Sequence, residues 1–280
     1  MSDLVSSVID LDRTALLEWY RRNRDRSRRL FDLLSPDAYY RQPIALRHPI
    51  VFYEGHLPAF SFNTLVKRAL GGSSIDDRLE RLFARGIDPA ENETRTHAEG
   101  WPDRDTVRAF ADEADRRVLH ALAHEELDRP GDPLLDRADA AFAILEHEAM
   151  HQETLLYMWH RLPFDVKRRP DGYVPRTDGA VPVQEPIAIP PGRAKLGAAR
   201  GSQAFAWDNE QPLTQAEVVA FSIDRHDVTN AAFLEFVEAG GYTNADWWTA
   251  QDWALPSPPG PAWEQAEASP ASTNPAAGME

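Results

Sequence analysis

Apolar residues recur at helical spacing from about residue 11 to residue 160, and this pattern predicts a bundle of helices. Leu16, Trp19 and Tyr20 share one face of a first helix, and Leu30 and Phe31 continue the pattern. Three prolines interrupt the next segment, which predicts a loop that leads into a short helix reaching Leu70. Gly71 and Gly72 end that helix. The remaining main helices are expected over 103–122 and 134–162, which gives four in all.

The pattern changes after Pro163, where helical periodicity gives way to a segment rich in Pro and Val. The fold expected is therefore α+β, with a helical domain, a linker and a second domain that contains strands. Thr229 is placed to cap a short helix in that second domain, and Gly240 follows the helix. The boundaries expected are 1–165 for the helical domain, 166–184 for the linker, 185–253 for the second domain and 254–280 for a disordered tail.

Charge and cysteine content narrow the possible partners. Asp and Glu total 45 against 30 Lys and Arg, and the net charge of -15 argues against nucleic acid and anionic membranes. A net negative charge of this size is more compatible with small-molecule substrates. No cysteine is present, so the chain has neither disulfides nor thiolate ligands. The first thirty residues do not resemble a secretory signal and no segment has 18 consecutive apolar residues, so a cytoplasmic protein is expected.

Seven arginines lie between Arg13 and Arg29. Their acidic neighbours favour a solvated helix face over an anion-binding rim. In the second domain, a polar cluster around Asp227 is expected to satisfy the backbone of a turn. Trp247, Trp248 and Trp253 are expected to pack rather than to form a binding platform.

The segment EHEAMHQE carries the sharpest chemical signal. His147 and His151 lie four residues apart in a helical run, so both imidazoles share one face and can bind one metal ion. A solvated or core-packed pair is the alternative without metal. The same segment matches H-E-x-x-H, in which Glu148 would serve as the base of a zinc protease. That interpretation is disfavoured because no metzincin extension follows and His160 comes nine residues after His151.

A third metal ligand has to come from elsewhere in the chain. His56 ranks first because the aromatic and aliphatic segment FYEGHLPAF surrounds it and directs it into the bundle. His48 is weaker, and His120 and His124 are expected to face solvent. Three neutral imidazoles leave about three open coordination positions, which suits Fe²⁺ binding a substrate and dioxygen, although zinc is chemically possible.

Several of these segments together resemble a known family. LRHPIVFYEGHLPAF, LFARGIDP and LEHEAMHQETLLYM are similar to the DinB-like domain of the non-haem iron sulfoxide synthases that make ergothioneine and ovothiol, and of the related selenoneine synthases. Downstream, IPPGRAKLGA, FAWDNEQP and VVAFSIDRHDVTNAAFLEFVEAGGY resemble the start of the formylglycine-generating-enzyme-like domain of these enzymes. The first two segments, ALRHPIVFYEGH and LFARGIDP, lean toward the ovothiol and selenoneine branches.

The resemblance implies an Fe²⁺- and O₂-dependent oxidoreductase that couples a thiol or a selenium donor to the imidazole of a histidine derivative such as trimethylhistidine. It assigns the iron ligands to His56, His147 and His151. Tyr53, Met150 and Gln152 are substrate-side candidates, and Met150 replaces the Gln that ergothioneine-type members often carry there.

The family's late second-domain Tyr and Asp have no counterpart before the chain stops, so a truncated synthase is expected and its catalytic residues in that domain stay unassigned. Two alternatives remain open. One is a three-histidine, metal-dependent thiol S-transferase or hydrolase of the DinB-like type. The other is a metal-binding remnant without turnover.

Overall fold

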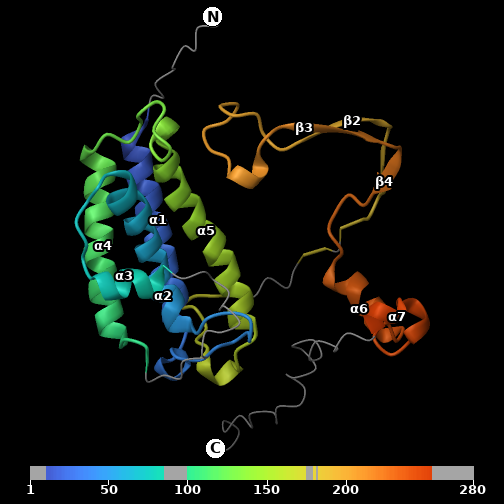
Figure 1. The fold of residues 1–280 in the computed structure, drawn as a ribbon. Coiled ribbons are helices and arrows are strands. Elements are labelled where there is room, and N and C mark those ends of the chain that lie inside the picture. The colour runs from blue at the N-terminus through green and yellow to red at the C-terminus, as the bar shows by residue number, and fades with distance from the viewer. Residues whose placement is uncertain (1–10, 85–99, 175–178, 181, 254–280) are drawn as a thin grey trace, which may run out of the picture. The chain divides into compact units, whose positions relative to one another are not determined.

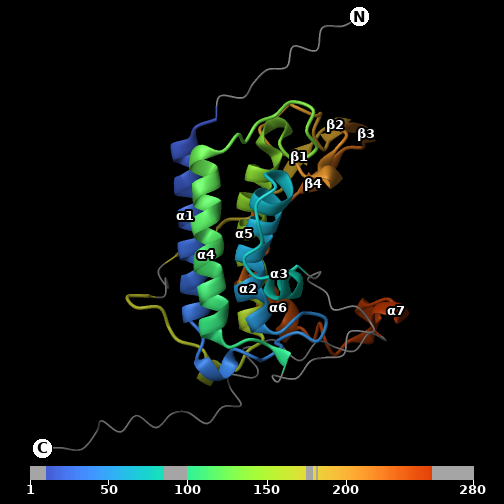
Figure 2. The same cartoon turned by 60° about the vertical axis from the view of Figure 1, so that its left-hand side comes forward.

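The computed structural model describes residues 11–84, 100–174, 179–180 and 182–253 (Figure 1). Its helical part contains five helices among these residues, packed side by side in the two views of Figures 1 and 2. The helices are α1 (Arg13–Asp32), α2 (Ile50–Ser61, continued by a π-helical segment, Phe62–Ala69), α3 (Asp77–Phe83), α4 (Arg104–His124) and α5 (Asp139–His160). The expected bundle is confirmed, and α3 is an additional short helix that the pattern did not predict.

Side-chain caps explain where these helices begin. Asp12, Asp76 and Asp103 each accept a hydrogen bond from a backbone N–H in the first turn of α1, α3 and α4. The segment after α2 ends as expected at Gly71, whose φ of 71° is a left-handed conformation that glycine adopts without strain. α5 begins at Asp139, five residues later than the pattern predicted.

Helix α2 is almost completely buried. Every residue from Ile50 to Ala59 is buried, and only Phe60, beside the cavity at His56, is partly exposed. Pro58 lies inside it, and the wider π-helical turn follows directly at Phe62. Such turns often occur beside functional sites. The consequence is that any polar side chain of α2 must find its partner inside the bundle.

The bundle has two apolar cores with a polar layer between them. One core holds Phe31, Phe52 and Trp159, and the other holds Leu16, Phe62 and Ile144. Buried polar residues lie between these levels on α1, α2, α4 and α5: Asn23, Arg24, Ser27, His56, Asp115, His147, Glu148, His151 and Gln152. Buried polar groups are costly unless they are paired, so this layer is where the structure carries its specific chemistry.

A later segment of the chain, Leu196–Thr214, belongs to the same compact unit as the bundle. Arg200 pairs with Asp136 at 2.6 Å, and the rings of Phe205 and Phe142 lie 6.4 Å apart. These contacts attach the segment to the start of α5.

The second unit contains short strands and helices. β1 (Ile187–Ile189) pairs antiparallel with β4 (Phe221–Ile223), and β2 (Gly192–Leu196) pairs with β3 (Thr214–Val218). Helix α6 (Asn230–Glu238) begins at Thr229, which accepts a hydrogen bond from Ala232 N as expected for a cap, and α7 spans Ala250–Trp253. The ring of Trp248 stacks on Tyr242, but Trp247, Trp248 and Trp253 are all exposed, so none of them is packed in a core as expected.

The second unit thus contains the strands that the pattern predicted, and the α+β class is confirmed. The tail predicted over 254–280 lies outside the described residues. Among the described helices, none has the length and apolar character needed to cross a membrane.

Candidate metal centre

His56 reaches the middle of the bundle from α2. Its Nδ1 lies 2.7 Å from the carbonyl oxygen of Phe83. Because a carbonyl oxygen only accepts, Nδ1 carries the ring proton and donates a hydrogen bond to that oxygen. Nε2 therefore presents its lone pair, and it has no hydrogen-bond partner among the described residues. A histidine whose second nitrogen donates to a carbonyl is oriented as metal-binding histidines are.

His147 and His151 reach the same point from α5. Their Nε2 atoms are 3.1 Å apart, and the His56 ring lies 5.1 Å and 5.0 Å from theirs, centroid to centroid. One nitrogen from each of the three residues lies within 4.8 Å of the others. Nitrogens bound about 2.0–2.1 Å from one cation lie about 2.9–3.4 Å apart for right-angled to tetrahedral geometry. The α5 pair already has that spacing, and a His56 nitrogen within 4.8 Å of both completes a group that could hold a metal ion.

Burial keeps all three imidazoles neutral. Desolvation, followed by the neighbouring histidines, lowers the pKa of His147 to about 2. Desolvation, His56 and Arg47 lower the pKa of His151 to about 3. The pKa of His56 is also lowered, mainly by burial, although its bond to Phe83 opposes the shift. Neutral imidazole is the form that binds metals, so no proton has to leave before a cation enters.

Aromatic rings enclose the three histidines. Phe60 stacks on His147 with ring centroids 3.5 Å apart, and Phe52 stacks on His56 at 4.9 Å. The buried ring of Tyr53 lies 6.1 Å from that of His151. Desolvation raises the pKa of Tyr53 to about 12, so its hydroxyl keeps a proton at neutral pH. These rings limit the access of water to the site.

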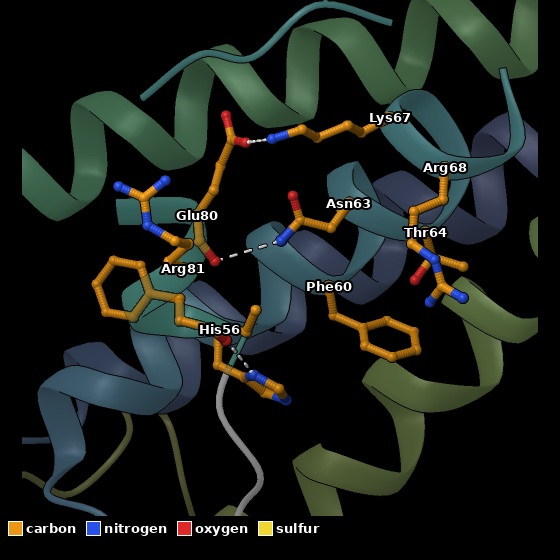
Figure 3. A pocket seen from close by; sticks show the side chains of 10 residues that line it. His56, Phe60, Asn63, Thr64, Lys67, Arg68, Glu80 and Arg81 are labelled. Carbon is orange, nitrogen blue, oxygen red and sulfur yellow. Dashed lines mark hydrogen bonds and ion pairs between the residues drawn. The ribbon is translucent and has the colours of Figure 1, made fainter. Parts of the chain in front are cut away.

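A cavity of about 370 Å³ opens onto His56 (Figure 3). Phe60 and Phe83 form apolar parts of its wall, and Asn63 and Thr64 add polar groups. Lys67, which lines it too, is held by Glu80, a buried carboxylate of α3. A cavity of this size accepts a molecule as large as an amino acid.

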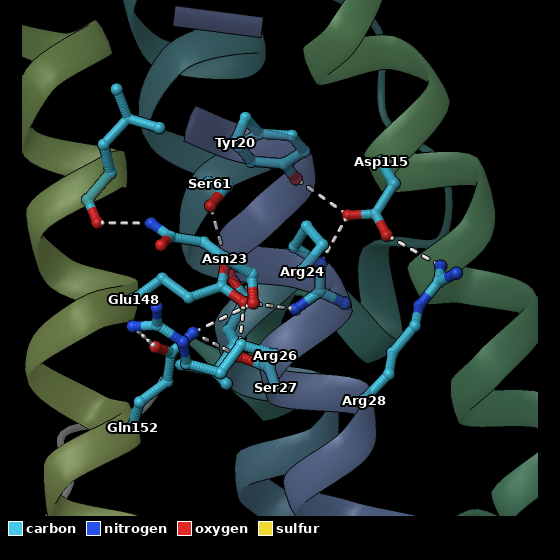
Figure 4. Close-up of polar contacts among 12 residues, drawn as sticks. Tyr20, Asn23, Arg24, Arg26, Ser27, Arg28, Ser61, Asp115, Glu148 and Gln152 are labelled. Atoms are coloured by element: carbon cyan, nitrogen blue, oxygen red, sulfur yellow. Dashed lines mark hydrogen bonds and ion pairs between the residues drawn. The ribbon is translucent and has the colours of Figure 1, made fainter. Parts of the chain in front are cut away.

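The other face of α5 is directed to α1 (Figure 4). Glu148 accepts hydrogen bonds from Ser27 at 2.7 Å and from Arg24 at 2.9 Å. Burial raises the pKa of Glu148 and Arg24 opposes this. Because Glu148 is engaged with α1 and not with the histidines, it does not occupy the position that the base of an H-E-x-x-H protease needs.

The same network corrects two expectations. Gln152 donates to Asn23 O at 2.9 Å and to Ser27 Oγ at 3.0 Å, so it binds α1 and does not face the histidines as a substrate-side residue would. Arg24 is buried, in contrast to the solvated face expected for all seven arginines. A sequence signal for this exists: Tyr20, Arg24 and Ser27 follow the same helical spacing as the apolar residues of α1, which places them on its buried face.

The remaining candidates are distributed over the surface and the core. Met150 is 49% exposed on α5, on the flank of the histidine face. His48 is buried and its ring lies 4.2 Å from that of Phe52, outside the three-histidine cluster. His120 and His124 are exposed, as expected. In the second unit, Asp227 is exposed and its carbonyl accepts a hydrogen bond from a side chain in the segment before β1.

Comparison with known proteins identifies the two parts of the chain. The model of the DinB superfamily matches residues 20–155, and that of the sulfatase-modifying factor enzyme 1-like domain matches residues 173–274. The chain therefore has a DinB-superfamily part followed by a part of the sulfatase-modifying factor type. This pair of matches, together with the relatives below, supports placing the chain with the ergothioneine synthase-type family.

Curated relatives carry names that agree with this family. The chain is 28% identical over 225 residues to "Ergothioneine biosynthesis protein 1" of Neurospora crassa, a match that covers 73% of this chain and 25% of the relative. It is 27% identical over 190 residues to "Hercynine oxygenase" of Mycolicibacterium smegmatis, covering 56% of this chain and 42% of the relative. The chain therefore spans less than half the length of these relatives.

Proposed function

We propose that the chain binds Fe²⁺ through His56, His147 and His151. With O₂ as the oxidant, it would form a C–S or C–Se bond between a thiol or selenium donor and the imidazole of a histidine derivative such as trimethylhistidine. The observation that carries this proposal is the convergence of three buried, neutral imidazoles from α2 and α5. The order of the two domains and the names of the relatives support it.

The proposed reaction balances with dioxygen as the oxidant. A thiol loses its S–H hydrogen and the imidazole carbon loses its hydrogen, while a C–S bond and an S=O bond form. These two changes release four electrons, which reduce O₂ to one sulfoxide oxygen and one water. Bound iron would supply a Lewis-acidic centre that exchanges electrons and holds donor and oxidant side by side.

The chain's own groups have distinct tasks in this scheme. The three imidazoles are neutral, so the charge of the cation is not reduced by its ligands. Phe83 O holds the proton of His56 Nδ1 and so fixes the ring. The rings of Phe52 and Phe60 stack on His56 and His147 and leave His56 accessible mainly from the cavity beside it. Met150, on the flank of the histidine face, and Tyr53, whose ring lies 6.1 Å from that of His151, are the substrate-side residues that we retain.

Zinc-dependent hydrolysis is the alternative chemistry at such a centre. It needs a general base within hydrogen-bond reach of a bound water. Glu148 is held by Arg24 and Ser27 on the α1 side, which disfavours it for this role. A thiol S-transferase that uses zinc or another divalent ion would need no oxygen, so oxygen dependence separates it from the proposed synthase.

Iron stoichiometry after anaerobic reconstitution tests the site. We expect about one Fe²⁺ per chain in the wild type and a loss of binding in His56→Ala, His147→Ala and His151→Ala. His120→Ala is the matched control, because His120 belongs to an exposed pair of histidines on α4. Binding that persists in His56→Ala would contradict the three-histidine site.

Isotope labelling tests the reaction. The reconstituted protein is given trimethylhistidine with a thiol, or with a selenium donor, under ¹⁸O₂, and products are identified by mass spectrometry. A coupled product that carries one ¹⁸O supports the synthase with a thiol donor. Metal binding without any coupled product under oxygen would leave the transferase, hydrolase or remnant alternatives and would overturn the proposed activity.

A further inference from the structure

Helix α5 carries two interleaved pairs of side chains. His147 and His151 form one pair, and Glu148 and Gln152 form the other. At about 100° per residue, the two histidines lie about 40° apart around the helix axis. Glu148 lies about 100° from His147, and Gln152 lies about 100° from His151. The histidine pair faces His56 of α2. The second pair faces α1 (Figure 4). One rotation of α5 therefore sets the position of both pairs.

The α1 side of this arrangement is closely connected. Ser27 Oγ donates to Glu148 Oε1 and accepts from Gln152 Nε2 at 3.0 Å, so one hydroxyl joins both members of the pair. Arg24 binds Glu148 with one nitrogen and, through Nε, binds Asp115 of α4 at 2.8 Å. The network thus fixes α5 against α1, and α1 against α4.

The ion pairs of this network are almost fully enclosed. The side chains of Arg24 and Glu148 are 9% and 1% exposed, and that of Asp115 is 10% exposed. Tyr20 and the half-exposed Arg28 complete the coordination of Asp115. Arg28 also pairs with the exposed Asp112 at 2.7 Å, so the network reaches the surface of the bundle at this end.

Stability alone does not account for such a network. Replacing a buried ion pair by apolar residues of similar volume is often neutral or stabilising, because desolvation of the charges offsets their attraction. Here Glu148 Oε2 has no partner among the described residues, which adds to the cost of burying the carboxylate. The Arg24–Glu148 pair can instead fix the orientation of α5 relative to α1, because Arg24 binds Glu148 and Asp115 in a fixed geometry.

We propose that Arg24 and Glu148 are positioning residues, which set the rotation of α5 so that His147 and His151 meet His56. This inference rests on the metal site of the proposed function. The required accuracy is high: an imidazole nitrogen lies about 7 Å from the helix axis, so a rotation of 10° moves it about 1.2 Å. Metal–ligand distances tolerate only about 0.2 Å.

The test separates orientation from stability with a double variant. Arg24→Met/Glu148→Met replaces the ion pair by unbranched apolar side chains, and Glu148→Gln keeps an acceptor for Ser27. The matched control is Arg13→Met, because Arg13 also joins α1 to the end of α4, through hydrogen bonds to the carbonyl oxygens of Leu122 and Glu125. Co²⁺ serves as the probe, since its visible spectrum reports the ligand geometry.

Each variant is measured without metal by thermal unfolding and with Co²⁺ for its Kd and spectrum. We expect the double variant to keep a cooperative unfolding transition and to bind Co²⁺ about 10- to 100-fold more weakly, with an altered spectrum. Glu148→Gln should recover part of that loss. Arg13→Met should lower the unfolding temperature and leave the Kd and the spectrum unchanged.

A wild-type Kd and spectrum in the double variant would overturn the positioning role while the metal site stood. Failure of the wild type itself to bind Co²⁺ or Fe²⁺ would overturn the proposed function, and this inference with it. If the double variant does not fold, Glu148→Gln and Ser27→Ala decide the matter, because unchanged Co²⁺ binding in both would overturn the role.

Discussion

Gly55 provides a direct way to disturb the candidate metal centre from outside its ligands. It lies on α2 next to His56, and the ring of Phe83 packs against its Cα face. A methyl group built at Gly55 would lie 2.3 Å, 2.4 Å and 2.5 Å from three atoms of that ring. Phe83 is fully buried and its ring borders the cavity beside His56, so the ring can yield only toward that cavity. Gly55→Ala must therefore displace the ring or α3, whose last residue, Phe83, supplies the carbonyl that orients His56.

The expected effect on stability is the difference between two opposing contributions. Alanine improves helix propensity over glycine by about 1 kcal/mol. Inserting a methyl group into a filled core costs about 1–3 kcal/mol, and an overlap of more than 1 Å with three ring atoms places this case at the upper end. We expect Gly55→Ala to lower the free energy of unfolding by about 2 kcal/mol, and to weaken metal binding because His56 loses its orientation.

Urea unfolding and Co²⁺ titration measure the two effects. Gly192→Ala is the control, since no atom lies within 4 Å of the methyl group built there. A double-mutant cycle with Phe83→Leu isolates the contact, because the smaller side chain makes room for the methyl group. The reasoning is refuted if Gly55→Ala is as stable as the wild type and binds Co²⁺ with the same Kd.

Three further predictions follow from the structure. Without metal, the free energy of unfolding should fall as the pH drops below about 6.5, because the unfolded chain then protonates His147 and His151, whose pKa values in the folded chain are about 2 and 3. Each histidine should contribute about 1.4 kcal/mol per pH unit to this fall. Equal pH slopes in urea titrations of the wild type and of His147→Gln/His151→Gln would contradict the prediction. Thr229→Ala should destabilise α6 by about 1 kcal/mol, seen as faster amide hydrogen exchange over 232–237, whereas Thr229→Ser should exchange as the wild type does. Met150→Gln should change the KM for the histidine derivative and leave the Co²⁺ Kd unchanged, because Met150 is half exposed beside the histidines; a weaker Kd would assign it to the metal site instead.

The pattern of the sequence predicted most of the helical domain because its signals are local. Leu16 and Tyr20 repeat at helical spacing, Asp103 caps a helix, and Gly71 ends one. α3 was not predicted, since its seven residues are mostly charged and only Leu79 and Phe83 enter the core. Short helices of this kind depend on packing rather than on their own periodicity.

For the candidate site too, the sequence predicts features that depend on local spacing and misses those that depend on distant contacts. The four-residue spacing of His147 and His151 predicts a shared face, and the apolar surroundings of His56 predict its inward direction. The partners of these residues depend on contacts between distant segments, as when the carbonyl of Phe83 orients His56 and Arg24 binds Glu148. Gln152 shows the limit of local reasoning, because neighbouring positions on one helix face different helices.

The enclosure of α2 has a consequence for how the chain is synthesised. His56 leaves the ribosome 91 residues before His147, and at 5–20 residues per second this interval lasts roughly 5–20 s. During this time an apolar helix that is almost completely buried in the folded chain has been made, while α5, which covers one side of it, has not. The nascent chain therefore exposes an apolar segment during this interval, and the three histidines can converge only after α5 has emerged.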